Sequence, residues 1–307
     1  MVNGGRVMKK INSNKVFDAV NIAILVLITF TMLYPLYFVI IASFSDPQAV
    51  ATGQVVLWVK KFSTESYTEI LKDNRIWTGY RNSIIYTCCN VVMSMTMTLL
   101  AAYALSKKYL RFRTAITFFF FLTMYIGGGM LPAYIQIKNM GLLNKPYTLI
   151  ALCGFSVYNM IIARTFFTNT IDASLFEAAE IDGASEIQKF LRIAFPLSKP
   201  IIAVLSLYYA VSSWNSYFTG MLYLSNSSYF PLQVVIKNIL IDGQTMLGGL
   251  DFGEMTEEQV KFYLHRLQLV ESMKYSVIFI ASLPMLIAYP FVQKHFVKGV
   301  MIGSVKG

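Results

Sequence analysis

Few side chains in this chain could take part in catalysis. The two histidines, His265 and His295, are isolated and have no ligand-like neighbours. Cys88, Cys89 and Cys153 fall within long apolar runs, where they indicate neither a disulfide framework nor a metal site. The chain also lacks the G-x-x-x-x-G-K-[ST] loop that holds nucleotide phosphates. We therefore expect a protein that is not an enzyme and that itself binds no metal or cofactor.

The polar residues that could carry a function are concentrated in one stretch, EAAEIDGASEIQKFLRIAFP, which runs from Glu177 to Pro196. Ser174 and Glu177 have the spacing of a capping box, which predicts a helix that starts at Leu175. Ala178 and Ala179 favour helix and are small enough to allow close backbone contact.

A glycine divides this stretch into two short helices. Asp182-Gly183 should end the first helix, because glycine accepts backbone angles that other residues resist. Ser185 with Gln188 forms a second capping pair, and Pro196 should stop the second helix. Apolar residues then recur at helical spacing and predict one apolar face, made of Ile187, Phe190, Leu191 and Ala194.

An exposed apolar face on a polar hairpin needs a partner to cover it. The face could lie on a lipid surface, but an anionic leaflet would repel the acidic residues of the hairpin, which are Glu177, Glu180, Asp182 and Glu186. Docking into a groove of another protein is the better interpretation.

The rest of the chain reads as membrane-spanning helices that position this hairpin. Of its 307 residues, 56% are hydrophobic and only 14% are charged, whereas soluble domains carry about 25% charged residues. A span needs about 20 mostly apolar residues. Uncharged runs near this length predict an all-α integral membrane fold in one transmembrane domain, 1–307. The expected spans are about 17–44, 82–106, 114–137, 146–170, 200–224 and 274–293, with the hairpin at 172–196.

The net charge of +10 is explained by membrane topology rather than by nucleic-acid binding. With six spans both termini share one side of the membrane, together with the turn from Lys107 to Arg113 and the polar hairpin. That side carries the denser basic residues, so the positive-inside rule places it in the cytoplasm.

Two features could line a path through the membrane. The sequence GGGMLPAY, from Gly127 to Tyr134, should interrupt the third span, either as a simple bend or as a break that lines the path. Trp214, Asn215 and Tyr217 lie near the middle of the fifth span, and sugar sites favour aromatic faces with a few polar groups. Packing between helices would explain these three residues equally well.

The segment from Ser225 to Ser272 is expected on the outer side. Its glycine-rich run DGQTMLGGLDFG suits a flexible, protruding loop. The alternative is a loop folded against its own spans.

The hairpin resembles the EAA loop of ABC-importer permeases, in which Glu-Ala-Ala, a glycine and a later proline stand at fixed spacing. The matching residues include Glu177, Ala178, Ala179, Gly183 and Pro196, although Phe195 stands where the family usually has leucine. The sequence SSWNSYFTGMLYL and the C-terminal QKHFVKGVMIGSVKG are similar to the carbohydrate-uptake branch, in particular to the second permease of the maltose system.

This resemblance implies a heterodimer with a second, homologous permease in the plasma membrane of a prokaryote. Two cytoplasmic ABC ATPases would bind ATP and Mg, and an extracellular or lipid-anchored binding protein would deliver a carbohydrate, with an oligosaccharide expected. The hairpin would be the coupling helix seated in an ATPase, with Ile187, Phe190 and Leu191 as its apolar plug. The competing interpretations are a secondary transporter, which should bury ionisable residues in its spans, and an ABC permease for another solute.

Overall fold

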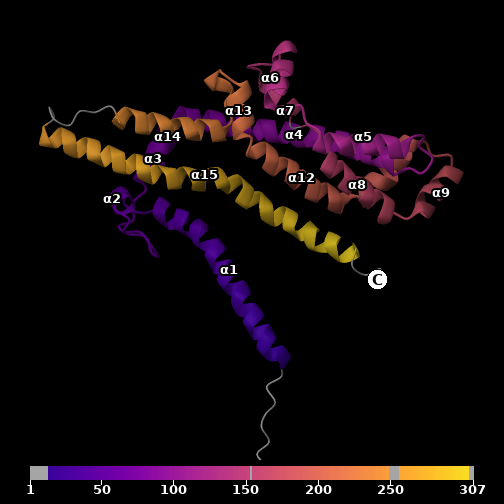
Figure 1. Cartoon of the computed structure of the whole chain (residues 1–307), viewed down its shortest axis with the longest axis horizontal. Helices are drawn as coiled ribbons and strands as arrows, with labels where there is room; N and C mark the ends of the chain where they lie inside the picture. The colour runs from indigo at the N-terminus through magenta and orange to yellow at the C-terminus, as the bar shows by residue number, and fades with distance from the viewer. Residues whose placement is uncertain (1–12, 153, 249–255, 304–307) are drawn as a thin grey trace, which may run out of the picture. The chain divides into compact units, whose positions relative to one another are not determined.

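The computed structural model describes residues 13–152, 154–248 and 256–303, and within these ranges the fold is built from helices without a β-sheet (Figure 1). This confirms the predicted all-α class. The chain divides into two compact units, which we describe separately. Unit 1 contains Met1–Glu69 and Gly243–Ile280, and unit 2 contains Ile70–Asp242 and Ala281–Gly307. The prediction of a single permease domain stays a prediction.

Unit 1 is organised where α1 meets α15. Its helices are α1 (Ser13–Ser43), α2 (Pro47–Ala51), most of α3 (Glu65–Lys72) and the first half of α15 (Glu257–Gly303). The Ser43 hydroxyl accepts a hydrogen bond from the Tyr67 hydroxyl at 2.7 Å, and its carbonyl accepts one from Ser276 at 3.2 Å. The remaining length of α1 exposes large apolar side chains, as a lipid-facing helix does.

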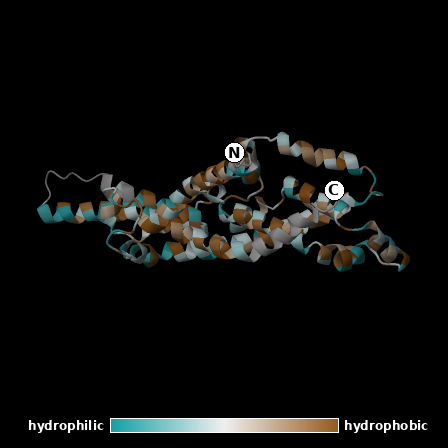
Figure 2. Ribbon diagram, turned by 90° about the horizontal axis from the view of Figure 1, so that it is seen from below, coloured by the Kyte–Doolittle hydropathy of each residue, from teal (hydrophilic) through white to brown (hydrophobic). Residues whose placement is uncertain are grey.

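Unit 2 is built around α4 (Asn74–Ser106). Two further helices pack against α4, namely α8 (Val157–Asn169) and α12 (Lys199–Trp214). Their shared apolar core includes the fully buried residues Met160, Ala163 and Leu205. Figure 2 shows hydrophobic residues along the long helices, and many of these side chains are exposed on the isolated chain.

A row of buried polar side chains runs along α4, and these side chains bond to segments far away in sequence. The Asn82 amide donates to the Ser228 and Phe230 carbonyls, at 2.9 and 3.1 Å. The Asn90 amide donates to the Ile150 carbonyl at 3.1 Å. Unmet polar groups in an apolar interior cost free energy, so these bonds fix which segments lie against α4.

The same row continues toward the middle of the bundle. The Thr98 and Tyr209 hydroxyls lie 2.6 Å apart, and the Tyr209 hydroxyl also accepts from the Ser156 backbone N–H at 3.2 Å. One helix surface of α4 therefore holds the start of α8 and the middle of α12 through a single tyrosine.

The expected spans are only partly continuous helices. Phe17–Ser43, Asn74–Ser106 and Glu257–Pro290 are each long and apolar enough to cross a membrane. Three bent helix pairs raise the possible number of spans to six within the described residues. The exact number of spans therefore stays a prediction.

Two of these pairs fall in the expected spans 114–137 and 146–170. Helices α5 (Arg113–Tyr125) and α6 (Met130–Asn139) meet at 110°, because the glycine run ends α5 and turns the backbone, with φ +81° at Gly129. The predicted interruption is thus confirmed. Helices α7 (Pro146–Leu152) and α8 meet at 50°.

The predicted loop from Ser225 to Ser272 is largely helical, which corrects the expectation of a flexible run. A short 3₁₀ turn, η2 (Ser227–Tyr229), leads into α14 (Leu232–Gly248), and α15 already begins at Glu257. Helix α14 packs against the start of α4, so its first half has a buried face to stabilise it. Residues 249–255, which hold the rest of the glycine-rich run, lie outside the described residues.

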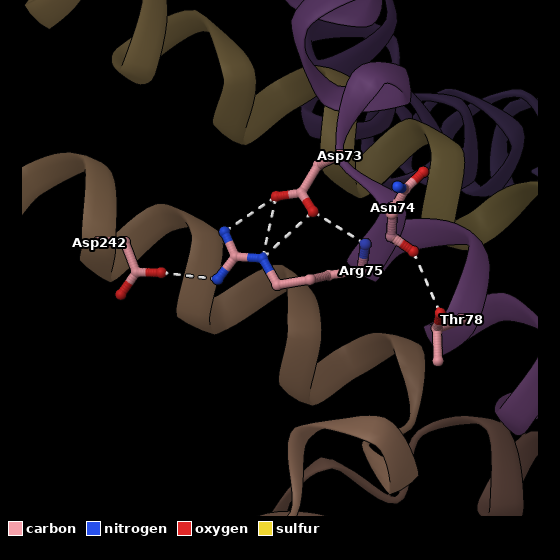
Figure 3. Close-up of polar contacts among 5 residues, drawn as sticks. All are labelled: Asp73, Asn74, Arg75, Thr78 and Asp242. Atoms are coloured by element: carbon pink, nitrogen blue, oxygen red, sulfur yellow. Dashed lines mark hydrogen bonds and ion pairs between the residues drawn. The ribbon is translucent and has the colours of Figure 1, made fainter.

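An ion-pair cluster joins the start of α4 to α14 in unit 2 (Figure 3). Arg75 bonds Asp73 through its side chain and its backbone N–H, and its guanidinium also bonds Asp242 of α14 at 2.9 Å. Burial would raise the pKa of Asp73, but the hydrogen bonds from Arg75 outweigh it and lower that pKa below its ordinary value. Arg75 therefore forms ion pairs with both Asp73 and Asp242.

Gly79 marks the point where α4 and α14 come closest. A Cβ at this position would lie 3.0 Å from the Leu232 Cα and 3.3 Å from the Leu232 backbone N. We predict that Gly79→Ala lowers the apparent melting temperature of the purified protein, since overpacking typically costs about 1–3 kcal/mol. Gly127→Ala is the matched control, because a Cβ added there would meet no atom within 4 Å. Equal melting temperatures for both variants would contradict the close packing.

Candidate functional site

The first helix of the polar hairpin is α9 (Ala173–Ile181). Its N-cap is Asp172, whose carboxylate accepts from the Ser174 backbone N–H at 3.0 Å. The predicted capping box at Ser174 is therefore wrong, and the helix starts two residues before Leu175. The carboxylate of Asp172 caps the free backbone N–H groups at the start of α9, so Ser174 lies inside the helix and not at its N-cap.

The turn between the helices follows the sequence prediction. Gly183 has φ +72°, and the backbone N–H of Ala184 bonds the Ala179 carbonyl at 2.9 Å. This is the left-handed closure that glycine favours at a helix end. The predicted capping pair is present in both directions: Ser185 N donates to the Gln188 side chain at 2.8 Å, and Gln188 N donates to the Ser185 hydroxyl at 3.3 Å.

The second helix departs from a regular α-helix. After α10 (Glu186–Lys189) comes a π-helical segment, η1 (Phe190–Ala194), in which the Phe195 N–H bonds the Phe190 carbonyl five residues back. The helix continues through α11 (Phe195–Leu197), so Pro196 does not stop it. The wider π turn accommodates Pro196, which has no backbone N–H to donate to the helix. The direction changes by 80° at Ser198, where α12 follows.

The π segment divides the predicted apolar face. Ile187 and Leu191 are 71% and 56% exposed, whereas Ala194 is fully buried. Phe190 is half-buried, and its ring packs on Tyr103 of α4 with centroids 5.1 Å apart. Phe190 therefore belongs to the internal core of the protein as much as to any docking face. Ala179 is half-buried. The other predicted hairpin residues are exposed, namely Glu177, Ala178, Asp182, Gly183 and Pro196.

A buried lysine, which the sequence analysis did not single out, joins the two helices of the hairpin. Lys189 is only 4% exposed, and its ammonium bonds Glu180 of α9 at 3.1 Å and Glu186 of α10 at 3.0 Å. The other carboxylate oxygen of Glu186 accepts from the Tyr103 hydroxyl at 3.1 Å. These contacts make a continuous polar connection from the hairpin to the end of α4.

Lys107, just after α4, adds a second support beneath the hairpin. Its ammonium lies over the rings of Phe176 and Tyr103, at 3.5 and 4.4 Å from their centroids, and 4.0 Å from Glu186. Burial is the main cause that lowers the pKa of Lys107, although Glu186 acts in the opposite direction. The cation holds α9 against α4 by its ring contacts more than by a close ion pair.

An apolar groove opens beside this support. It has a volume of about 890 Å³ and lies between α4 and the second hairpin helix; its lining includes Met95, Leu99, Tyr103, Ile187, Phe190 and Leu191. On the hairpin itself, Ile181 at the end of α9 is 88% exposed. The hairpin therefore presents Ile181, Ile187 and Leu191 as exposed apolar side chains on a framework fixed by buried polar bonds.

The residues predicted to line a path are divided by a helix break. Trp214 ends α12, is 3% exposed, and its indole N–H bonds the Ala281 carbonyl at 3.0 Å, so it packs inside unit 2. Asn215 is exposed, and its amide bonds the Val211 carbonyl at 3.0 Å. Tyr217 starts α13 (Tyr217–Tyr223) and is half-buried. The break therefore leaves Asn215 exposed and Tyr217 half-buried, whereas Trp214 is buried.

The described residues contain no cluster with the composition of a metal site. No group of three or more histidine, cysteine, aspartate or glutamate side chains there could hold a metal ion. His295 and Cys153 lie outside the part whose side chains are described, as does the whole C-terminal sequence used for the family resemblance.

Comparisons with known proteins match nearly the whole chain. The family model described as "Binding-protein-dependent transport system inner membrane component" matches residues 76–302. The polygalacturonan/rhamnogalacturonan transport system permease protein YtcP of Bacillus subtilis (strain 168) is 36% identical, over 96% of this chain and 99% of that protein. Protein LplC of the same organism is 33% identical over 98% of both.

A solved structure is similar over the same length. It is a chain of a bacterial ABC transporter involved in the import of the acidic polysaccharide alginate, with a TM-score of 0.81 and 31% sequence identity. The match covers 96% of this chain and 100% of that one.

We predict that Lys189→Met loosens the hairpin, because Glu180 and Glu186 would face each other without their shared cation. Amide hydrogen exchange across 173–189 in the purified protein should become about tenfold faster or more. Lys199→Met is the matched control, since Lys199 is exposed and forms no ion pair among the described residues. Unchanged exchange in Lys189→Met would show that the buried ion pairs do not hold the hairpin.

Proposed function

We propose a mechanism for this chain from the premise that it belongs to the family of binding-protein-dependent transport system inner membrane components. It is a multi-pass plasma-membrane protein and a permease subunit of a carbohydrate ABC importer. The observation that carries this function is likeness over nearly the full length to YtcP and to the alginate importer, whose names specify polysaccharide transport. We propose an oligosaccharide as the substrate.

The competing functions are less well supported. A secondary transporter would use ionisable residues buried in its spans for ion coupling, but the buried row on α4 consists of neutral amides and hydroxyls such as Asn90 and Thr98. A non-sugar solute would have to be carried by a chain whose relatives include a polygalacturonan permease.

We place the hairpin in the cytoplasm, with both termini on that side and six spans in which bent pairs count once. This orientation follows the basic residues around the Lys107–Arg113 turn. In it, Ile181, Ile187 and Leu191 project from the hairpin toward a cleft in an ABC ATPase, which binds ATP and Mg. The chain itself supplies no catalytic group.

Nucleotide-driven movement of the ATPase would then reach the spans by two supports. Lys189 and Glu186 connect the hairpin to Tyr103 of α4, and the bend at Ser198 connects it to α12. Helix α12 ends at the break beside Asn215 and Tyr217. A displacement at the ATPase would thus move the residues at the break, which we place beside the solute path.

The remaining partners complete the importer. A second, homologous permease would form the other wall of the path and cover apolar surface that the isolated chain exposes. An extracellular or lipid-anchored binding protein would deliver the sugar to the outer side, where we place α14. Lipid would surround the rest, and no nucleic acid is involved.

Uptake in reconstituted liposomes tests the proposed function. The chain, its second permease, the ATPases and the binding protein should together accumulate labelled oligogalacturonate or neutral oligosaccharide only when ATP is present on the ATPase side. Omission of this chain should abolish uptake. ATP-independent uptake, or accumulation driven by an ion gradient, would overturn the assignment to an ATP-driven importer.

A sharper prediction concerns the apolar tip of the hairpin, which consists of the exposed side chains Ile181, Ile187 and Leu191. We expect Ile181→Ser and Ile187→Ser each to reduce recovery of the ATPase with the detergent-solubilised permease pair. Apolar anchors in an interface often contribute about 2 kcal/mol, which corresponds to a roughly thirtyfold loss of affinity. Recovery is measured per permease heterodimer.

The control is a variant of Phe190, which is half-buried and packs against the protein's own core. Phe190→Ala removes a ring that packs on Tyr103, so it should lower the yield of folded permease. Ile181 and Ile187 project outward, so their serine variants should assemble with the second permease normally. Full recovery of the ATPase with both serine variants would show that the apolar tip does not contribute to ATPase binding.

A further inference from the structure

Two hydrogen-bond donors from different helices converge on one weak acceptor in unit 2. The Tyr217 hydroxyl of α13 donates to the Met221 Sδ at 2.9 Å, and the Lys237 ammonium of α14 approaches the same sulfur at 3.5 Å. The ammonium also lies 5.0 Å from the centroid of the Tyr217 ring. All three side chains are at least partly accessible. A thioether is a poor acceptor, so both donors would gain from a stronger one.

No carboxylate of the described residues supplies that stronger acceptor. Among the described residues Lys237 forms no ion pair, and α14 carries a single acidic residue, Asp242. Asp242 is already bound to Arg75, which also holds Asp73 (Figure 3). Within the part of the chain that the structure describes, the close partners of the Lys237 ammonium are therefore a ring and a sulfur.

The neighbouring elements add positive charge. The end of α13 is tied to α6 and to the start of α7, because Tyr134 and Tyr223 stack with centroids 6.1 Å apart and the Asn144 N–H bonds the Tyr223 carbonyl at 2.8 Å. Helices α6, α7 and α13 contain no acidic residue. Lys138 lies in the last turn of α6 and Lys145 precedes α7, and both side chains are exposed.

This charge runs against the usual membrane bias. In the orientation proposed above, these elements lie at the outer end of unit 2, where the positive-inside rule expects few lysines. If these lysines served only solubility, acidic side chains or pairs of opposite charge would do equally well. Exposed lysines on elements joined to α13, beside a break in a span, are instead suited to attract an anionic solute.

We propose that Lys237 and Tyr217 form a subsite for the carboxylate of a uronic-acid residue in the transported oligosaccharide. The ammonium and the hydroxyl donate to the carboxylate, in place of the Met221 sulfur. The Tyr217 ring lies beside this point and offers a flat surface to the sugar. Lys138 and Lys145 contribute to the attractive field without direct contact. This inference rests on the proposed function and narrows the substrate class to acidic oligosaccharides.

The test is uptake by the complete importer in liposomes of constant lipid composition. The probes are labelled trigalacturonate and a neutral galactose trisaccharide, each at limiting concentration. Lys237→Gln should reduce trigalacturonate uptake about tenfold or more, since a hydrogen bond between charged groups is lost. Lys237→Arg should retain most uptake, and raising the salt concentration should weaken wild-type uptake of trigalacturonate but not of the neutral sugar.

Controls separate the subsite from a general defect. Lys60→Gln removes an exposed lysine of unit 1 and should leave trigalacturonate uptake unchanged. Tyr217→Phe should reduce trigalacturonate uptake by a smaller factor than Lys237→Gln, because it keeps the ring and loses only a neutral donor. Basal ATP hydrolysis with Lys60→Gln should equal that of the wild type.

Each contrary outcome has a distinct meaning. If Lys237→Gln leaves trigalacturonate uptake intact, or lowers uptake of both sugars equally, the carboxylate subsite is wrong; the second result would place Lys237 in packing or in contact with lipid headgroups. If the wild-type importer takes up only the neutral sugar, the inference fails and the proposed function stands. If it takes up no carbohydrate, the proposed function fails as well.

Discussion

Unit 2 depends on the requirement that polar groups buried beside apolar helices find partners. Helix α4 carries these groups, and each bond fixes a different part of the chain: Asn82 holds the turn before α14, Asn90 holds α7, and Thr98 holds α12 through Tyr209. Apolar packing alone tolerates sliding of one helix along another, whereas a hydrogen bond has a short range and a direction. The row on α4 therefore sets the positions that the surrounding apolar contacts then fill.

The hairpin is attached to this framework by charge rather than by apolar contact alone. Glu186 accepts from Tyr103 on α4 and from Lys189, and Lys189 reaches across to Glu180 on the other hairpin helix. A buried ion pair is costly to break because the remaining charge stays desolvated. The hairpin can thus move with α4 as one piece while Ile181 and Ile187 stay exposed on its surface.

Local signals in the sequence predicted most of the hairpin, since a glycine turn and the Ser185–Gln188 pair depend on residues within a few positions. The apolar face was partly wrong because it assumed regular helical spacing. Lys189 and Ala194 are both buried and stand five residues apart, a spacing that one face of an α-helix does not hold but that the π segment permits. Nor could the sequence alone reveal that Glu180 and Glu186 neutralise Lys189. The helical form of α14 likewise depends on packing against α4, which lies far away in sequence.

The row on α4 also has a consequence for synthesis. A ribosome completes α4 before α8 and α12 exist, and Thr98 must await a partner 111 positions later. During that interval α4 is a span with several unmet polar groups, which makes its transfer from the insertion machinery into lipid less favourable. Thr98 gains its partner only when α12 arrives, so nascent chains that end before Tyr209 should remain recognisable to membrane quality-control proteases.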